Sequence, residues 1–143
     1  MKKFVIFLVI VLIIICGFSY YYITYKENYK TIQKQNMAFE EYKDKEVYGA
    51  DLATAMNKAM DSNTKNNIEK TTNGKWINND KNSIQIEIKM LDTEKTYSME
   101  DFYQTGIEEF IKYYNKIKFK CIDIQYHNST HQVKYMLFEQ ITT

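Results

Sequence analysis

The feature that most constrains this chain is an apolar block that starts directly after its first two lysines. The residues from Phe4 to Ile15 are all Phe, Val, Ile or Leu, and no charged residue follows before Lys26. The 20 residues from Phe4 to Ile23, at about 1.5 Å each, are long enough to cross a hydrocarbon core of about 30 Å. At about −0.3 to −0.6 kcal/mol per residue, the leading block supplies roughly −4 to −7 kcal/mol toward insertion. We therefore predict a membrane anchor over residues 1–23, with lipid contacts over residues 4–23.

The flanks of the block predict its orientation. Lys2 and Lys3 favour a cytoplasmic N-terminus, which places the rest of the chain outside the cytoplasm. The three tyrosines at 20–22 suit the headgroup boundary, because their rings are apolar and their tips polar. A cleaved signal peptide is the alternative, with Gly17 and Ser19 as the small residues before a cut at Tyr20, and it would yield a secreted protein.

The rest of the chain is polar and balanced in charge. The whole sequence has a mean hydropathy of −0.50 in spite of the apolar block. Beyond Lys3 there are 17 basic residues against 18 acidic ones, and every basic residue is Lys. Without a basic excess or any Arg, the composition argues against nucleic-acid binding. Cys16 lies in the anchor and Cys121 in the polar part, so we expect no disulfide between them.

The segment 24–48 is predicted to be a helical stalk. From Thr24 to Val47 the sequence has no Gly or Pro and is rich in Lys, Glu and Gln, which are good helix formers. Aromatic and apolar residues recur at spacings of three and four. This stripe indicates either a helix that packs on its own domain or a short coiled coil with another chain. In the coiled coil, Asn36 would fix the register of self-association.

Residues 49–143 are predicted to form an α+β domain with a mainly antiparallel sheet. Gly49 interrupts the stalk, Asp51 is a candidate cap for a helix to about Met60, and Ser62 to Gly74 is rich in loop residues. Ser98 and Asp101 resemble a capping box that starts a helix to about Asn115, within which Gly106 is a weak point. Strands are expected at Trp76–Ile77, Ile84–Met90, Lys95–Ser98, Lys116–Tyr126 and His131–Ile141. The predicted order after the anchor is α-α-βββ-α-ββ.

The strand at 116–126 contains a change in its pattern. Its apolar residues shift phase near Cys121, which indicates a β-bulge or a strand covered on both faces.

Chemistry-bearing residues are few. His127 and His131 flank one turn and, with Asp123 or Glu139, offer fewer ligands than a metal centre usually has, so we interpret them as exposed turn residues. Cys121 with a nearby histidine could act as a nucleophile, but a thiol in an apolar strand is typical of a small buried side chain. The sequence therefore predicts no catalytic residue, cofactor or metal site.

The aromatic residues are the remaining candidates for recognition. Trp76, Tyr103, Tyr113 and Tyr126 could form a surface that contacts a peptide or a glycan. Tyr and Trp are suited to this because they offer a large contact area, few rotors and a polar tip. The competing interpretation is that they are ordinary core and boundary residues.

The run from Val47 to Met60, VYGADLATAMNKAM, is similar to one in small membrane-anchored proteins of clostridia-like bacteria. In those proteins a hydrophobic N-terminal helix also precedes a compact polar domain. The resemblance implies a bacterial source and an envelope location, but no activity, cofactor or site residue.

Together these features predict a non-enzymatic, membrane-anchored envelope protein. Its exported domain would be an accessory or scaffold subunit that contacts a partner protein. The alternative is an extracytoplasmic binding module for cell-wall glycan or a small ligand.

Overall fold

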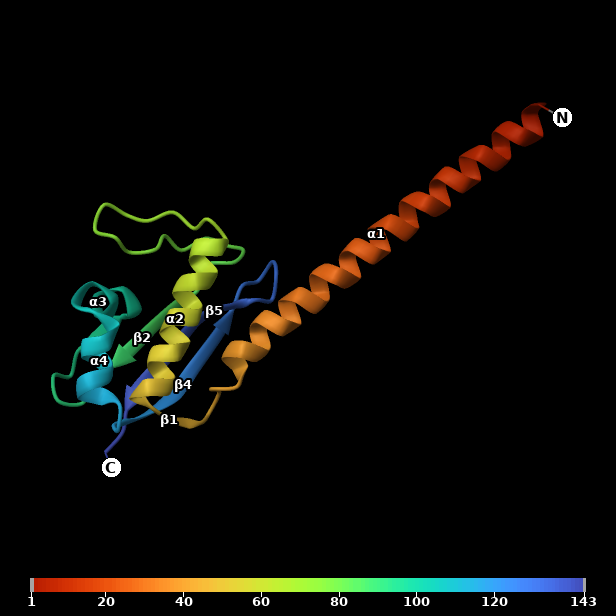
Figure 1. Cartoon of the computed structure of the whole chain (residues 1–143). Helices are drawn as coiled ribbons and strands as arrows, with labels where there is room; N and C mark the ends of the chain where they lie inside the picture. The colour runs from red at the N-terminus through yellow and green to blue at the C-terminus, as the bar shows by residue number, and fades with distance from the viewer. Residues whose placement is uncertain (1, 143) are drawn as a thin grey trace. The chain divides into compact units, whose positions relative to one another are not determined.

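The computed structural model describes residues 2–142, which form two compact units, one ending at Lys34 and the other beginning at Gln35. The elements, in chain order, are α1 (Lys2–Glu40), β1 (Glu46–Tyr48), α2 (Gly49–Lys65), β2 (Gln85–Lys89), β3 (Thr96–Ser98), α3 (Met99–Thr105), α4 (Ile107–Tyr114), β4 (Lys118–Tyr126) and β5 (Val133–Gln140) (Figure 1).

The first unit is the leading part of α1. Among the described residues, this helix is the one long and apolar enough to span a membrane. Apart from Val11, the apolar side chains of the block are exposed. This helix is continuous from Lys2 to Glu40, so the expected anchor and most of the expected stalk form one helix.

The stalk prediction is wrong about where the helix stops. Helix α1 ends at Glu40 rather than Val47, and Glu46–Tyr48 is an edge strand. The last turn of α1 belongs to the folded unit, because its Phe39 is buried in the core, as is Tyr42 just beyond the helix. Asn36 also binds the main chain: its side-chain amide donates to the carbonyl of His131 (2.7 Å) and accepts from the N–H of Val133 (2.9 Å). This residue therefore has a partner within its own chain.

The second unit contains a five-stranded sheet in the order β1-β4-β5-β2-β3. Three of the strand pairs are antiparallel, and β2 with β5 is parallel, so the sheet is mixed rather than purely antiparallel. A parallel neighbour requires a crossover, and the segment with α3 and α4 provides it before the chain returns through β4. The combination of helices with a largely antiparallel sheet is as predicted, whereas the predicted order of elements along the chain matches only in part.

The core lies between one face of the sheet and helices α2 and α4 (Figure 1). The alternation predicted for the strand at Ile84–Met90 is confirmed, since Ile84, Ile86, Ile88 and Met90 are all buried. Buried side chains of β4 and β5, such as Phe119 and Phe138, complete the core. The largest fully buried side chains include Phe119, Phe138, Leu52, Met56 and Met136.

The β-bulge predicted near Cys121 is confirmed. In the register between β4 and β5, Cys121 pairs with Phe138 and Asp123 pairs with Leu137, so Ile122 is the extra residue. This insertion accounts for the phase shift in the apolar pattern.

Three local predictions are corrected. Asp51 is not the cap of α2: the N-cap position is Tyr48, without a side-chain hydrogen bond, and α2 runs on to Lys65. The capping box of Ser98 and Asp101 is present, but the helix breaks at Gly106, whose φ of 102° lies outside helical geometry. The expected strand at Trp76–Ile77 is reduced to a single bridge between Lys70 and Trp76.

Candidate functional site

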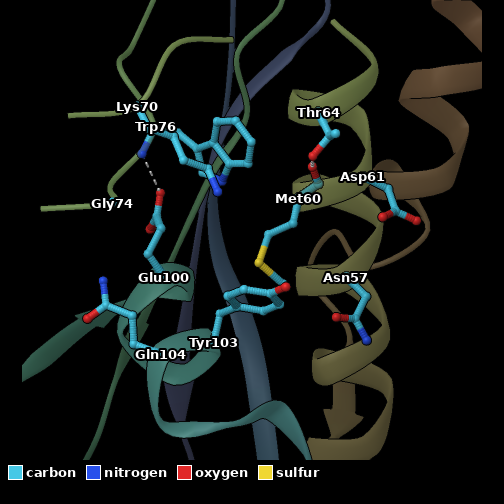
Figure 2. A pocket seen from close by; sticks show the side chains of 10 residues that line it. All are labelled: Asn57, Met60, Asp61, Thr64, Lys70, Gly74, Trp76, Glu100, Tyr103 and Gln104. Carbon is cyan, nitrogen blue, oxygen red and sulfur yellow. Dashed lines mark hydrogen bonds between the residues drawn. The ribbon is translucent and has the colours of Figure 1, made fainter. Parts of the chain in front are cut away.

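A small pocket lies between α2, α3 and the irregular segment that connects α2 to β2 (Figure 2). It has a volume of about 120 Å³ and is partly open to solvent. At about 10–15 Å³ for each water-sized sphere, this is space for a chemical group much larger than one water molecule. Its lining is Asn57, Met60, Asp61, Thr64, Lys70, Gly74, Trp76, Glu100, Tyr103 and Gln104.

Helix α2 supplies one wall of the pocket. Asn57, Met60, Asp61 and Thr64 stand at positions i, i+3, i+4 and i+7, so a single face of the helix presents them all. Met60 is almost fully buried and forms the apolar floor. The hydroxyl of Thr64 donates to the carbonyl of Met60 (2.9 Å), which leaves Asn57 and Asp61 as the polar groups of this wall.

A short turn within the connecting segment supplies the opposite rim. The N–H of Thr71 donates to the carbonyl of Lys75 (2.8 Å), and the N–H of Gly74 donates to the carbonyl of Thr71 (2.9 Å). Gly74 has a φ of 77°, a conformation that glycine adopts without strain. The turn therefore has a defined shape of its own.

Helix α3 ties this turn in place. The side-chain amide of Gln104 donates to the carbonyl of Asn73 (3.1 Å), and the ammonium of Lys75 lies 3.2 Å from a carboxylate oxygen of Asp101. The capping box at the start of α3 holds the pKa of Asp101 below its usual value, in spite of the opposing effect of burial, because Ser98 donates to the carboxylate. The rim is thus fixed to the helix that carries Glu100 and Gln104.

Glu100 is the most unusual side chain in the pocket. Only 7% of it is exposed, although a carboxylate is rarely buried without a charged partner. Its Oε1 accepts a hydrogen bond from the main-chain N–H of Trp76 (3.2 Å), the dashed line in Figure 2. In the described part of the chain, no lysine lies within salt-bridge distance of it.

Trp76 and Tyr103 bring aromatic surface to the pocket. The indole of Trp76 is 8% exposed, and the ammonium of Lys70 lies 4.1 Å from its ring centroid. Tyr103 is 59% exposed and its ring lies on the side of the pocket opposite Trp76, next to the Met60 side chain (Figure 2). One aromatic ring is therefore built into the wall, whereas the other is open to solvent.

The four aromatic residues singled out from the sequence do not gather at one place. Trp76 and Tyr103 line the pocket, but Tyr113 and Tyr126 do not. Tyr113 is exposed on α4, with the ammonium of Lys112 5.5 Å from its ring centroid. Tyr126, on β4, donates a hydrogen bond to Glu40 at the end of α1 (2.9 Å).

The polar lining residues escaped the sequence analysis for a physical reason. Asn57, Asp61, Glu100 and Gln104 are ordinary residues of helices, and nothing in their spacing indicates that two separate helices face each other. The one usable signal was the buried tryptophan in a segment otherwise rich in Asn, Thr and Lys. Its ring had to pack against something, and α2 and α3 are the elements that meet it.

Two of the residues considered for catalysis, His127 and Cys121, are buried. His127 is buried, contrary to the prediction of an exposed turn residue, and its Nε2 lies 2.8 Å from the carbonyl oxygen of Ser83. Cys121 is buried, and desolvation raises the pKa of its thiol to about 11. Between residues 2 and 142, no group of three or more His, Cys, Asp or Glu side chains is placed to hold a metal ion.

Comparisons with protein-family models, with curated proteins and with solved structures find no match to this chain.

Proposed function

We propose that the protein is a membrane-tethered binding module whose second unit takes up a small polar ligand, such as a wall-glycan fragment, in the pocket between α2 and α3. The observation that carries this proposal is the convergence of Trp76, Tyr103 and the buried carboxylate of Glu100 on one enclosed space. An aromatic ring with hydrogen-bonding groups beside it is a typical arrangement for a polar ring-shaped ligand.

The tether is the leading part of α1. From Phe4 to Ile15 its apolar side chains are exposed apart from Val11, and exposing so much apolar surface to water is unfavourable. Lipid contacts over residues 4–23 remove that cost. Lys2 and Lys3 support a cytoplasmic N-terminus and therefore a pocket outside the cytoplasm.

Trp76 makes the proposal directly testable because it is the single tryptophan of the chain. When it is excited selectively over the 13 tyrosines, the tryptophan emission of the full-length protein in detergent reports on the surroundings of Trp76. We expect a saturable change in emission when a panel of solubilised wall fragments and small sugars is titrated. A flat response across the panel would contradict ligand binding at this site.

Two matched variants test whether the ligand binds in this pocket. Tyr103→Ala removes an exposed ring that lines the pocket, whereas Tyr113→Ala removes an equally exposed ring outside it. We expect the first change to weaken binding by about tenfold, in line with the stacking and hydrogen bonding of one aromatic side chain. The second should leave the titration unchanged. Equal effects from both variants would argue against this pocket.

An accessory subunit that contacts a partner protein is the second candidate. One observation favours it: β1 pairs with Lys118–Lys120 of β4, and no strand in the described residues pairs on that side of Asp123–Tyr126. The neighbouring Ile122 is exposed. Such an edge is suited to an extended peptide segment of another envelope protein, added as a further strand.

Photocrosslinking distinguishes the second candidate. A crosslinker at Ile122 should capture one protein in native membranes, and a crosslinker at the exposed Lys95, away from that edge, should not. Failure of Ile122 to capture any protein would remove the support for a partner at this edge.

A further inference from the structure

One oxygen of Glu100 faces the pocket with no hydrogen bond. Oε1 accepts from the N–H of Trp76, but in the described residues Oε2 has no partner. Among those residues, every fully buried side-chain oxygen or nitrogen does have a partner. Oε2 is therefore not fully buried, and the pocket that Glu100 lines is where it reaches solvent.

The indole N–H of Trp76 also lacks a hydrogen-bond partner among the described residues. No hydrogen bond from Nε1 is found between residues 2 and 142, and the same reasoning makes this atom accessible. The two residues lie in direct contact through the hydrogen bond between the main chain of Trp76 and Glu100. The pocket thus offers a charged acceptor and a neutral donor that the protein itself does not use.

The charges around the pocket leave it one negative charge in excess. Asp61 and Glu100 are acidic, and Lys70 is the basic lining residue. Lys75 and Asp101, which flank the rim, form an ion pair with each other and cancel. A ligand that carries one positive charge would neutralise the lining.

The position of Lys70 indicates which kind of cation the aromatic lining of the pocket attracts. Its ammonium lies over the face of Trp76 rather than within salt-bridge distance of Glu100. A cation–π contact of this kind draws an ammonium toward the electron-rich ring. The open ring of Tyr103 offers a second such face beside the pocket.

We infer that the ligand carries a primary ammonium group, which Glu100 Oε2 binds, next to an oxygen that accepts from the indole N–H of Trp76. An amino sugar with a free amine has this arrangement of groups, because a hydroxyl lies next to its amine. This inference rests on the proposed function and specifies the chemistry of the ligand at that same pocket.

The experiment compares three sugars that differ at one position. Glucosamine, N-acetylglucosamine and glucose are titrated separately into the full-length protein in detergent, in a mildly acidic buffer that keeps the amine protonated, with Trp76 fluorescence as the readout. A hydrogen bond to a charged group is worth more than one to a neutral group. We therefore expect glucosamine to bind at least about tenfold more tightly than either of the other two sugars.

The outcomes separate this inference from the proposed function. If the three sugars bind equally, or the acetylated sugar binds best, the ammonium inference is wrong and the binding module stands. If none of the sugars binds but wall fragments do, the inference is again wrong. If nothing binds at all, the proposed function fails with it.

Glu100→Gln provides the matched control, because it keeps the size of the side chain and an acceptor oxygen for the N–H of Trp76. We expect this variant to lose the preference for glucosamine while its thermal unfolding stays close to that of the parent. Glu109→Gln, at an exposed carboxylate of α4 outside the pocket lining, should keep the preference. A glucosamine preference that survives Glu100→Gln would overturn the assignment of this carboxylate.

Discussion

The side-chain amide of Asn63 holds both main-chain polar groups of Ile84. Its Nδ2 donates to the carbonyl oxygen of Ile84, and its Oδ1 accepts from the N–H of the same residue, each at 2.8 Å. Asn63 is fully buried near the end of α2, and Ile84 directly precedes β2. This pair therefore closes the connecting segment that carries Trp76.

Replacing Asn63 by Ala should destabilise the second unit strongly. The change leaves a buried donor and a buried acceptor without partners, at about 1–3 kcal/mol each, so we expect a loss of about 2–6 kcal/mol. Chemical denaturation followed by Trp76 fluorescence measures it. The control is Asn57→Ala on the exposed face of the same helix, which should stay within about 0.5 kcal/mol. Equal losses for the two variants would contradict a structural role for the Asn63 amide.

Gly49 marks a close approach between α2 and the end of α4. A Cβ atom at this position would lie 2.0 Å from the carbonyl oxygen of Tyr114, a main-chain atom that cannot move aside easily. In a free helix, Gly→Ala is favourable by about 1 kcal/mol. Here we expect the opposite sign, a destabilisation of about 1–3 kcal/mol or more from overpacking.

The measurement for Gly49→Ala is thermal unfolding of the full-length protein. Gly17→Ala is the matched control, because a Cβ atom at Gly17 meets nothing within 4 Å. A stabilised Gly49→Ala variant would show that α2 and α4 do not approach each other this closely.

The elements with strong local signals were predictable from the sequence. The alternation of Ile84, Ile86 and Ile88 defined β2, and the phase shift at Cys121 indicated the bulge. The short edge strand β1 was missed because three residues cannot show a period of two. Its existence depends on pairing with β4, some 70 positions further along the chain.

The parallel pairing of β2 with β5 could not be deduced for a related reason. Strand neighbours are chosen by packing between distant segments, and a sequence pattern reports only on near ones. The candidate site depends even more on such packing. In the sequence Glu100 looks like an ordinary helix residue. Its carboxylate is buried because α3 packs beside Trp76, a contact between distant segments.

Cys121 should react with thiol reagents only after unfolding. Burial in the core raises the pKa of its thiol to about 11, from the ordinary value of 9.0, so the reactive thiolate is scarce as well as covered. Because the folded pKa is raised, the stabilisation from the neutral thiol is complete below pH 9 and is lost as the pH rises toward 11.

The test of the Cys121 prediction is labelling of a Cys16→Ser variant, which leaves one thiol. We expect slow labelling at neutral pH, fast labelling in denaturant, and a decline in stability over the alkaline window that Cys121→Ala does not show. Rapid labelling of the folded protein would contradict the buried position.

Tyr126 should titrate unusually late. Burial, followed by its hydrogen bond to the carboxylate of Glu40, raises the pKa of this phenol to about 12. The neutral form is therefore stabilised below pH 10, and this contribution is lost as the pH rises through about 12. Glu40→Gln removes the negative charge beside the hydroxyl and should lower the pKa of Tyr126.

Nuclear magnetic resonance of carbon-labelled tyrosine rings can follow Tyr126 separately. Glu41→Gln is the matched control, because the neighbouring Glu41 binds Lys58 (2.8 Å) rather than Tyr126. An identical titration of Tyr126 in the parent and in Glu40→Gln would contradict the contact between the end of α1 and β4.

Attachment to the membrane should depend on the apolarity of the leading block. Each lysine at the centre of a spanning helix costs about 2.5–3.5 kcal/mol, against the roughly −4 to −7 kcal/mol that the block supplies. Val9→Lys combined with Ile13→Lys should therefore cancel most or all of the driving force and release the protein from carbonate-washed membranes. Val9→Leu with Ile13→Leu, which keeps the block apolar, should remain in the membrane pellet. Retention of the double lysine variant would show that another part of the chain, or a partner, holds the protein at the membrane.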